Sequence, residues 1–123
     1  MKNIFHEFDP VLYPVKLWVI VTDNNKVLND RFSWYPKEDI NIDFNISNAT
    51  AGIALKKKGE LLGVLIVFEN SKQLNVKNIA HETSHAVRRI WNHLGEDYFG
   101  DEATAYLSGW IADCCWKVKT GKV

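Results

Sequence analysis

The sequence predicts one α+β domain, in which a small antiparallel or mixed β-sheet is followed by two packed helices. Residues 11–69 alternate or run apolar, as strands do, whereas apolar residues recur at helical spacing from Asn75 onward. The length of 123 residues suffices for one modest core and is too short for two. Because no repeat, low-complexity segment or linker divides the chain, we expect residues 1–123 to form a single domain.

The β-rich part is expected to begin with a hairpin. Residues 15–22 are rich in β-branched and aromatic side chains, which predicts a strand. Asp23-Asn24-Asn25 has turn chemistry, so residues 27–35 are expected to return as the other arm. Residues 40–46 then alternate between apolar and polar side chains, which predicts a further strand with one buried face.

A second hairpin is predicted from residues 51–57 and 61–68, joined by the turn Lys58-Gly59-Glu60. The second of these strands is almost entirely apolar, so we expect it to lie in the centre of the sheet with both faces covered. The basic run at 56–58 has no interleaved aromatic residues and is interpreted as a solvated hairpin tip.

Two amphipathic helices are predicted at 75–94 and 101–118. Asn75 can cap the first helix and Gly95 can end it, while Asp101 can cap the second. The apolar stripe of the first helix comprises Ile79, Ala80, Ala86, Val87, Ile90, Trp91 and Leu94. The inward positions of the second helix are Ala103, Leu107, Trp110, Ile111, Cys114 and Val118.

The composition narrows the class of protein. Fifteen basic and fifteen acidic residues give a formal net charge of zero, which argues against a nucleic-acid partner. The start of the chain lacks the pattern of an export signal, and the longest apolar run, 61–68, is too short to cross a membrane. Cys114 and Cys115 are adjacent on a helix and are expected to be buried free thiols. We therefore expect a cytoplasmic protein without a membrane or nucleic-acid partner, and the sequence indicates no oligomeric state.

Five residues of the first helix, His81-Glu82-Thr83-Ser84-His85, have the pattern of a zinc site. His81 and His85 are four residues apart, so both imidazoles project from one face and can reach one ion. Zinc held by two neutral imidazoles, a carboxylate and a water molecule is a catalytic arrangement, and Glu82 stands where it can take a proton from that water. The alternative is a pair of surface histidines beside an unrelated glutamate.

A third protein ligand has to come from elsewhere. A His-x-x-Gly-x-x-His continuation is absent, because Arg88 and Trp91 occupy its glycine and final histidine positions. His93 is rotated away from the ligand face of the helix. The remaining candidates are the acidic residues Glu96, Asp97, Asp101 and Glu102.

Among these acids, Glu102 is favoured as the third ligand. A short connection predicts that the second helix packs back antiparallel on the first, which can turn its first-turn residues toward the histidines. Asp101 is the reserve, because it is already explained as a helix cap. Glu102 has an alternative explanation of its own, as a first-turn acid that the helix dipole stabilises.

These motifs resemble those of the zincin metallopeptidases, specifically the gluzincin branch. The resemblance is carried by the pentad at 81–85 together with a helix-borne Glu102. Residues 100–110 (Gly-Asp-Glu-Ala-Thr-Ala-Tyr-Leu-Ser-Gly-Trp) are also similar to a stretch of small zincin-like proteins from phages and mobile elements. The similarity covers residues 61–115.

The resemblance implies a fold and an activity. It implies one Zn²⁺ bound by His81, His85 and Glu102, with Glu82 as the general base that acts on a peptide or protein substrate. It also implies a minimal zincin-like fold, in which an edge strand beside the active-site helix pairs with an extended substrate. That edge is expected either in the hairpin 51–68 or in the strand 40–46.

Other side chains are candidates for assisting roles. Tyr106, one helical turn after Glu102, is the first candidate for an oxyanion donor, with Tyr98 and His93 after it. Tyr106 can equally be a core residue with its hydroxyl at the rim. Asp101 and Asp113 are candidates for orienting the imidazoles.

The sequence thus leads to a main functional hypothesis and two alternatives. The main hypothesis is a zinc-dependent hydrolase that cleaves peptide or isopeptide bonds. The first alternative is a catalytically silent, zincin-derived binding module, for example a phage or mobile-element accessory protein, with a structural or vestigial metal site. The second is zinc-dependent hydrolysis of a non-peptide amide.

Overall fold

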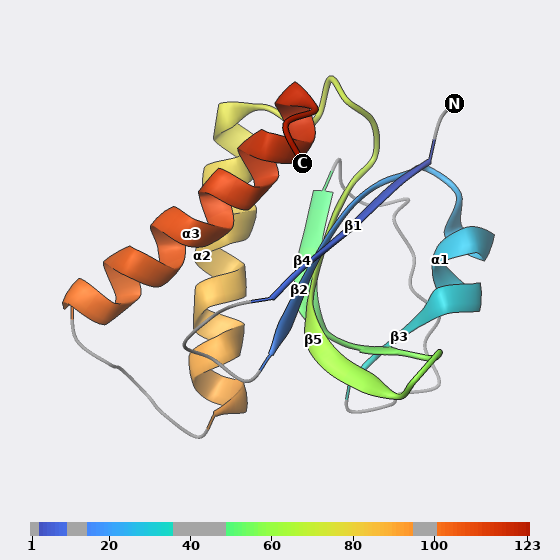
Figure 1. Ribbon diagram of the computed structural model, residues 1–123, viewed down its shortest axis with the longest axis horizontal. Helices are drawn as coiled ribbons and strands as arrows, with labels where there is room; N and C mark the ends of the chain where they lie inside the picture. The colour runs from blue at the N-terminus through green and yellow to red at the C-terminus, as the bar shows by residue number, and fades with distance from the viewer. Residues whose placement is uncertain (1–2, 10–14, 36–48, 95–100) are drawn as a thin grey trace.

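The computed structural model describes residues 3–9, 15–35, 49–94 and 101–123, and these form an α+β fold with a five-stranded mixed sheet (Figure 1). The strand order is β1-β2-β5-β4-β3. The elements in chain order are β1 (Ile4–Phe8), β2 (Lys16–Val21), α1 (Asn25–Arg31), β3 (Phe32–Trp34), β4 (Ala49–Lys56), β5 (Leu61–Phe68), α2 (Val76–His93) and α3 (Asp101–Thr120).

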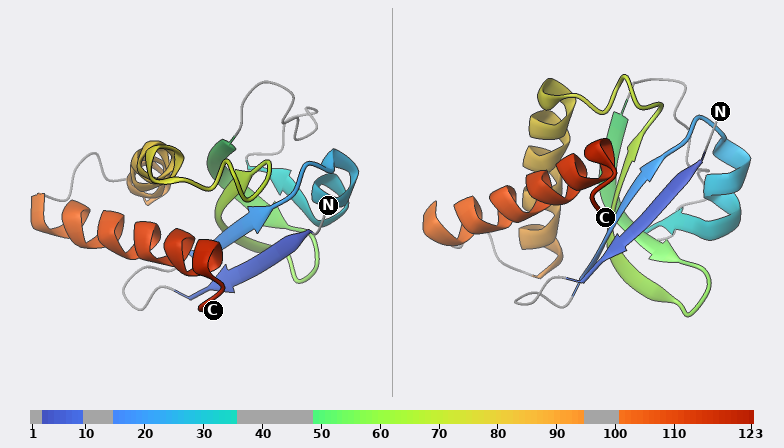
Figure 2. Two further views of the ribbon diagram at one scale, coloured as in Figure 1. Left: turned by 90° about the horizontal axis from the view of Figure 1, so that it is seen from above. Right: turned by 45° about the horizontal axis from the view of Figure 1, so that its top comes forward.

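The helices cover the sheet from both sides. Helices α2 and α3 lie on one face and the short helix α1 lies on the other, as the two views in Figure 2 show. The larger part of the core lies between the sheet and the two long helices, and it includes Val19, Ile66, Phe68 and Ile111. A smaller cluster under α1 includes Leu28, which is fully buried.

Strand β5 lies at the centre of the sheet, as predicted. It pairs in parallel with β2 and antiparallel with β4. Val64 and Ile66 face the long helices while Leu65 and Val67 face α1, and all four are at most 1% exposed. This two-sided burial explains why the strand is apolar at nearly every position.

The prediction that residues 27–35 return as a hairpin arm is wrong. The structure has α1 there, followed by the three-residue strand β3, which pairs with β4 on the far side of the sheet. The asparagine that we assigned to a turn caps a helix instead, because the Asn24 side chain accepts a hydrogen bond from the Val27 amide at 3.1 Å. Leu28 then anchors the helix in the smaller core cluster.

Strand β1 was missed by the sequence analysis. It pairs antiparallel with β2, with Ile4 opposite Val21 and Phe8 opposite Leu17. The polar pair His6-Glu7 interrupts its apolar pattern, which hides the strand in the sequence. Glu7 is held there because it accepts a hydrogen bond from the Trp18 indole at 2.7 Å.

The second predicted hairpin and both long helices are present. Strands β4 and β5 pair in register from Ala49–Phe68 to Lys56–Leu61, and Lys58 is exposed at the turn between them. Asn75 caps α2, because its side chain accepts a hydrogen bond from the Asn78 amide at 2.9 Å. The predicted strand 40–46 and the predicted stop at Gly95 lie outside the described residues.

The two cysteines of α3 are free and buried. Burial raises the pKa of the Cys114 thiol to about 11, and burial together with the neighbouring Cys114 raises the pKa of Cys115 to about 12. In the part of the chain that the structure describes, no helix is long and apolar enough to cross a membrane.

We expect opposite effects on stability from adding a methyl group at two glycines. In Gly63→Ala, the new Cβ would lie 2.6 Å from the carbonyl oxygen of Lys16 in the neighbouring strand, so the variant should lose about 1–3 kcal/mol of unfolding free energy. Gly109→Ala is the matched control, because its Cβ meets nothing within 4 Å and the change should stabilise α3 by up to about 1 kcal/mol. Urea denaturation measures both, and an equally stable Gly63→Ala would contradict the β2–β5 register.

The two thiols should react with Ellman's reagent only after unfolding. At pH 8 a thiol with a pKa of about 11 is ionised in about one molecule in a thousand, and the thiolate is the reactive form. Because the pKa of the folded thiol lies above the ordinary value of 9.0, the unfolded protein loses this proton at lower pH than the folded protein. The contribution of the thiol to the free energy of unfolding is therefore fully present below about pH 9 and is lost as the pH rises toward 11. Absorbance of the released thiolate, with a guanidinium-unfolded sample as control, tests this, and rapid labelling of the folded protein would contradict it.

Candidate metal and acid–base site

Helix α2 presents the histidines of the pentad on its outer side. Its inner side buries Ile79, Ala86 and Ile90 against β4 and β5. His81 and His85 lie on the opposite side of the helix and are both exposed. The packing of the apolar stripe therefore fixes the direction in which the two imidazoles project.

The two imidazoles meet at a distance that suits a shared metal ion. The Nε2 atoms of His81 and His85 are 3.2 Å apart, and the ring centroids are 4.8 Å apart. In a tetrahedral zinc site with Zn–N bonds of about 2.0–2.1 Å, two nitrogen ligands lie roughly 3.3–3.4 Å from each other. The donor pair therefore fits zinc, and without an ion the same distance allows a hydrogen bond between the two rings.

Glu82 is a largely buried acidic residue. The residue is 7% exposed, its carboxylate oxygens are not fully removed from solvent, and it forms no hydrogen bond or ion pair with any residue that the structure describes. Burial raises the pKa of this carboxyl group, while the charges of His81 and His85 oppose the increase. Buried carboxylates are normally paired, so one left unpaired beside two imidazoles is a candidate acid–base group.

Part of β4, called the open edge below, has no described strand beside it on the side away from β5. Strand β3 pairs only with Ala54–Lys56, and the Tyr35 amide donates a hydrogen bond to the Ile53 carbonyl at 3.0 Å. Backbone groups of every second residue in a strand point to the same side. The amide and carbonyl groups of Ala51 therefore point to the same side as the carbonyl group of Ile53. Among the described residues, no strand pairs with 50–52 on that side. The sequence could not single out this edge, because the short length of β3 is not visible in its pattern.

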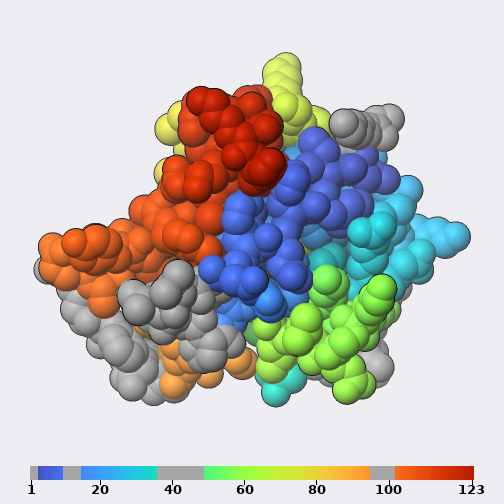
Figure 3. All heavy atoms as spheres, in the orientation of Figure 1, coloured from blue at the N-terminus to red at the C-terminus, as the bar shows by residue number. Residues whose placement is uncertain are grey.

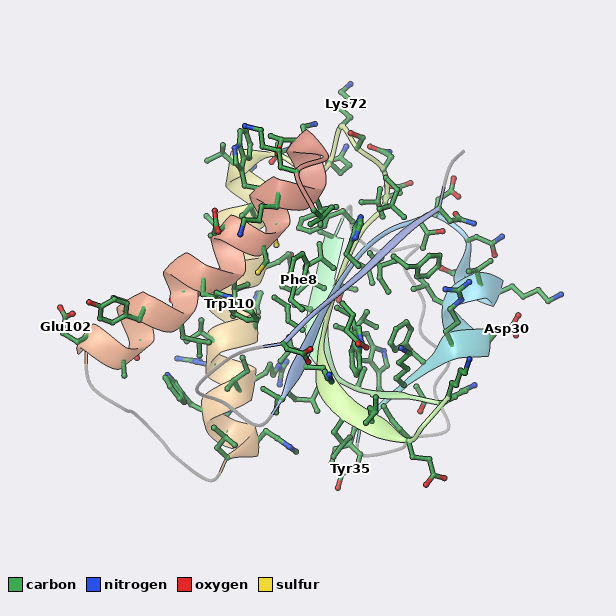
Figure 4. All side chains as sticks on the ribbon, in the orientation of Figure 1. Phe8, Asp30, Tyr35, Lys72, Glu102 and Trp110 are labelled. Atoms are coloured by element: carbon green, nitrogen blue, oxygen red, sulfur yellow. The ribbon has the colours of Figure 1, made fainter. Side chains whose placement is uncertain are left out.

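The structure does not bring Glu102 to the histidine pair. Helix α3 crosses α2, with a hydrogen bond from the Trp91 indole to the Thr104 hydroxyl at 3.2 Å. Its N-terminal end extends outward as an arm in Figure 3, and Figure 4 shows Glu102 at the tip of that arm, where it is exposed. Over the described ranges, no group of three or more His, Cys, Asp or Glu side chains is placed to hold a metal.

The other candidates are also apart from the pair. Tyr106 is 74% exposed on α3, and Asp113 forms an ion pair with Lys117 at 3.2 Å. The imidazole of His93 packs edge-on against the ring of Tyr35, with centroids 6.0 Å apart. Glu96, Asp97 and Tyr98 lie outside the described residues, as does the side chain of Asp101.

Comparisons with protein-family models, with curated protein sequences and with solved structures find no match to this chain. The interpretation of the site therefore rests on the residues of the chain itself.

We expect Zn²⁺ to stabilise the folded protein through the histidine pair. At a zinc concentration of about 100 times the dissociation constant, binding to the folded state should add about 2.7 kcal/mol. For a domain of this size that raises the unfolding temperature by roughly 10 °C, measurable by circular dichroism.

The variants His81→Ala and His85→Ala should abolish this zinc response. His93→Ala is the matched control on the same helix and should keep it. A wild-type unfolding temperature that zinc leaves unchanged, or an equal response in His81→Ala, would contradict a metal site at this pair.

Proposed function

We propose that this chain is a zinc-dependent hydrolase, a metallopeptidase that cleaves peptide or isopeptide bonds with Glu82 as general base. The observation that carries the proposal is the largely buried Glu82, unpartnered among the described residues, beside two imidazoles whose Nε2 atoms are 3.2 Å apart. A surface histidine pair with an unrelated glutamate would leave that glutamate in solvent, where its charge is hydrated at no cost.

His81 and His85 would hold the zinc ion, and Glu102 is proposed as the third ligand with Asp101 in reserve. The assignment of Glu102 rests on the sequence, since the structure leaves it at the outer end of α3. When bound, zinc lowers the pKa of a water molecule to about 7 and polarises the carbonyl group of the substrate.

Glu82 would move the proton. Its carboxylate oxygen accepts a proton from the attacking water and then donates it to the nitrogen of the leaving amine. The absence of a competing partner among the described residues leaves both carboxylate oxygens available for this role. Glu82 lies within α2 and is among its buried residues.

The open edge of β4 is the proposed position for the substrate backbone. Ala51 directs its amide and carbonyl groups outward there, and α2 packs on the same strand. An extended peptide that adds to this edge would gain main-chain hydrogen bonds and lie beside α2. A reducing, cytoplasmic setting is also part of the proposal, and the two free, buried cysteines support it.

A catalytically silent binding module is the second candidate. It is favoured by the finding that no third ligand joins the two histidines within the described part of the chain. Two imidazoles alone hold zinc weakly compared with three or four ligands. The open strand edge would then bind a partner without cleaving it.

Glu82→Gln should separate these two candidates. The amide is close in shape to the carboxylate but cannot accept the proton, so the hydrolysis rate should fall by about 10²–10⁴-fold. Zinc content should stay unchanged, because the histidines are intact. Mass spectrometry of a peptide library measures cleavage, and elemental analysis measures the bound metal.

The variants His81→Ala and Glu102→Ala should lose both zinc and activity, whereas Asp113→Asn is the control that keeps both. A fully active Glu82→Gln on a confirmed substrate would rule out the proposed mechanism. A zinc-free wild type that cleaves no peptide after zinc is added would favour the binding module.

A further inference from the structure

A groove of about 790 Å³ runs between α2 and α3. Its walls include Thr83, Ser84 and Arg88 from α2, and Thr104 and Ser108 from α3. The volume lies within the range of small-molecule and peptide side-chain sites. Most of these polar groups are hydroxyls, so the groove can donate several hydrogen bonds from both helices.

The groove lies next to the histidine pair along the surface of α2. Ser84 is three residues after His81, and Arg88 is three residues after His85. Residues at this spacing are neighbours on a helix, with Cβ atoms about 5–6 Å apart. The groove therefore begins where the proposed metal site ends, on the flank of α2 that faces α3.

The charge of the groove favours an anion. Arg88 is the one charged side chain among the described residues that line it. The Arg88 guanidinium is exposed and forms no ion pair or hydrogen bond with any residue of the described ranges. Its neighbour Arg89 is equally exposed but does not line the groove.

A buried hydroxyl adds to this evidence. Thr83 is 5% exposed, and its Oγ1 atom is buried without a hydrogen-bond partner among the described residues. Unpartnered buried polar atoms are rare, and each needs an explanation such as an absent ligand or water. A guanidinium fork with nearby hydroxyl donors matches the two oxygens of a carboxylate.

We propose that Arg88 binds a carboxylate group of the substrate in this groove, as a specificity-determining contact beside the site of hydrolysis. The identity of the ligand as substrate rests on the function proposed above. The carboxylate can be the C-terminus of a peptide or an aspartate or glutamate side chain. In either case the substrate is anionic next to the bond that is cut.

The test measures binding to the full-length Glu82→Gln protein after metal is removed on a chelating resin. The probes are N-acetyl-Ala-Ala with a free C-terminal carboxylate, its C-terminal amide, and N-acetyl-Ala-Glu amide with a side-chain carboxylate. Amide signals of Ser84, Thr104 and Ser108 are followed by two-dimensional NMR. At least one carboxylate probe should shift these signals and bind tenfold or more tightly than the neutral amide, as expected for a charged hydrogen bond.

Arg88→Gln should remove that preference, and Arg89→Gln should keep it. The C-terminal and side-chain probes distinguish the two sources of the carboxylate. Equal binding of the neutral amide, no shift with any probe, or an equal loss in both arginine variants would overturn the proposal. Since no metal or turnover is involved, this result is independent of the zinc and activity measurements, and failure of one leaves the other interpretable.

Discussion

The packing of α2 against β4 and β5 is the constraint on which the candidate site depends. The apolar stripe is buried except at Ala80, which is exposed, and Leu94, which is partly buried. This burial against the sheet fixes the rotation of the helix about its axis. Once that rotation is fixed, His81 and His85 must face outward on one row, and Glu82 must lie at the margin of the buried side. A rotation by one residue position would bury an imidazole and expose part of the core.

The burial of Glu82 is the feature that favours the proposed site over a surface pattern. A carboxylate that loses part of its hydration without gaining a partner among the described residues weakens the fold. Proteins retain such groups mainly where chemistry or binding requires them. The two neighbouring imidazoles, which oppose the upward shift of its pKa, are the natural place for a cation that would relieve this cost.

The surroundings of α2 differ on its two flanks. On one flank, the short strand β3 leaves Ala51 of β4 without a described strand on the side away from β5, so its outward backbone groups are unpaired within the described residues. On the other flank, α3 crosses α2 and leaves a groove with hydroxyl groups and Arg88. The two histidines lie on α2 between the open edge of β4, which is proposed to bind a peptide backbone, and the groove beside α3, which is proposed to bind an anionic group. This arrangement gives the proposed hydrolase two separate means of choosing its substrate.

The sequence by itself determined the features that follow from residue spacing: the change from strand to helix, the central apolar strand β5, the N-cap of α2 at Asn75, and the paired imidazoles of His81 and His85. These follow from local spacing, which sets the direction of side chains within one element. The sequence prediction failed at α1, because an asparagine side chain can stabilise either a turn or the start of a helix. It also failed at β1, because polar residues interrupt this strand and its pairing with β2 stabilises it. Only the tertiary structure showed the burial of Glu82, the part of β4 without a described neighbour on its outer side, and the position of Glu102 at the outer, N-terminal end of α3. These depend on how separate elements pack, and short-range spacing carries no information about that packing.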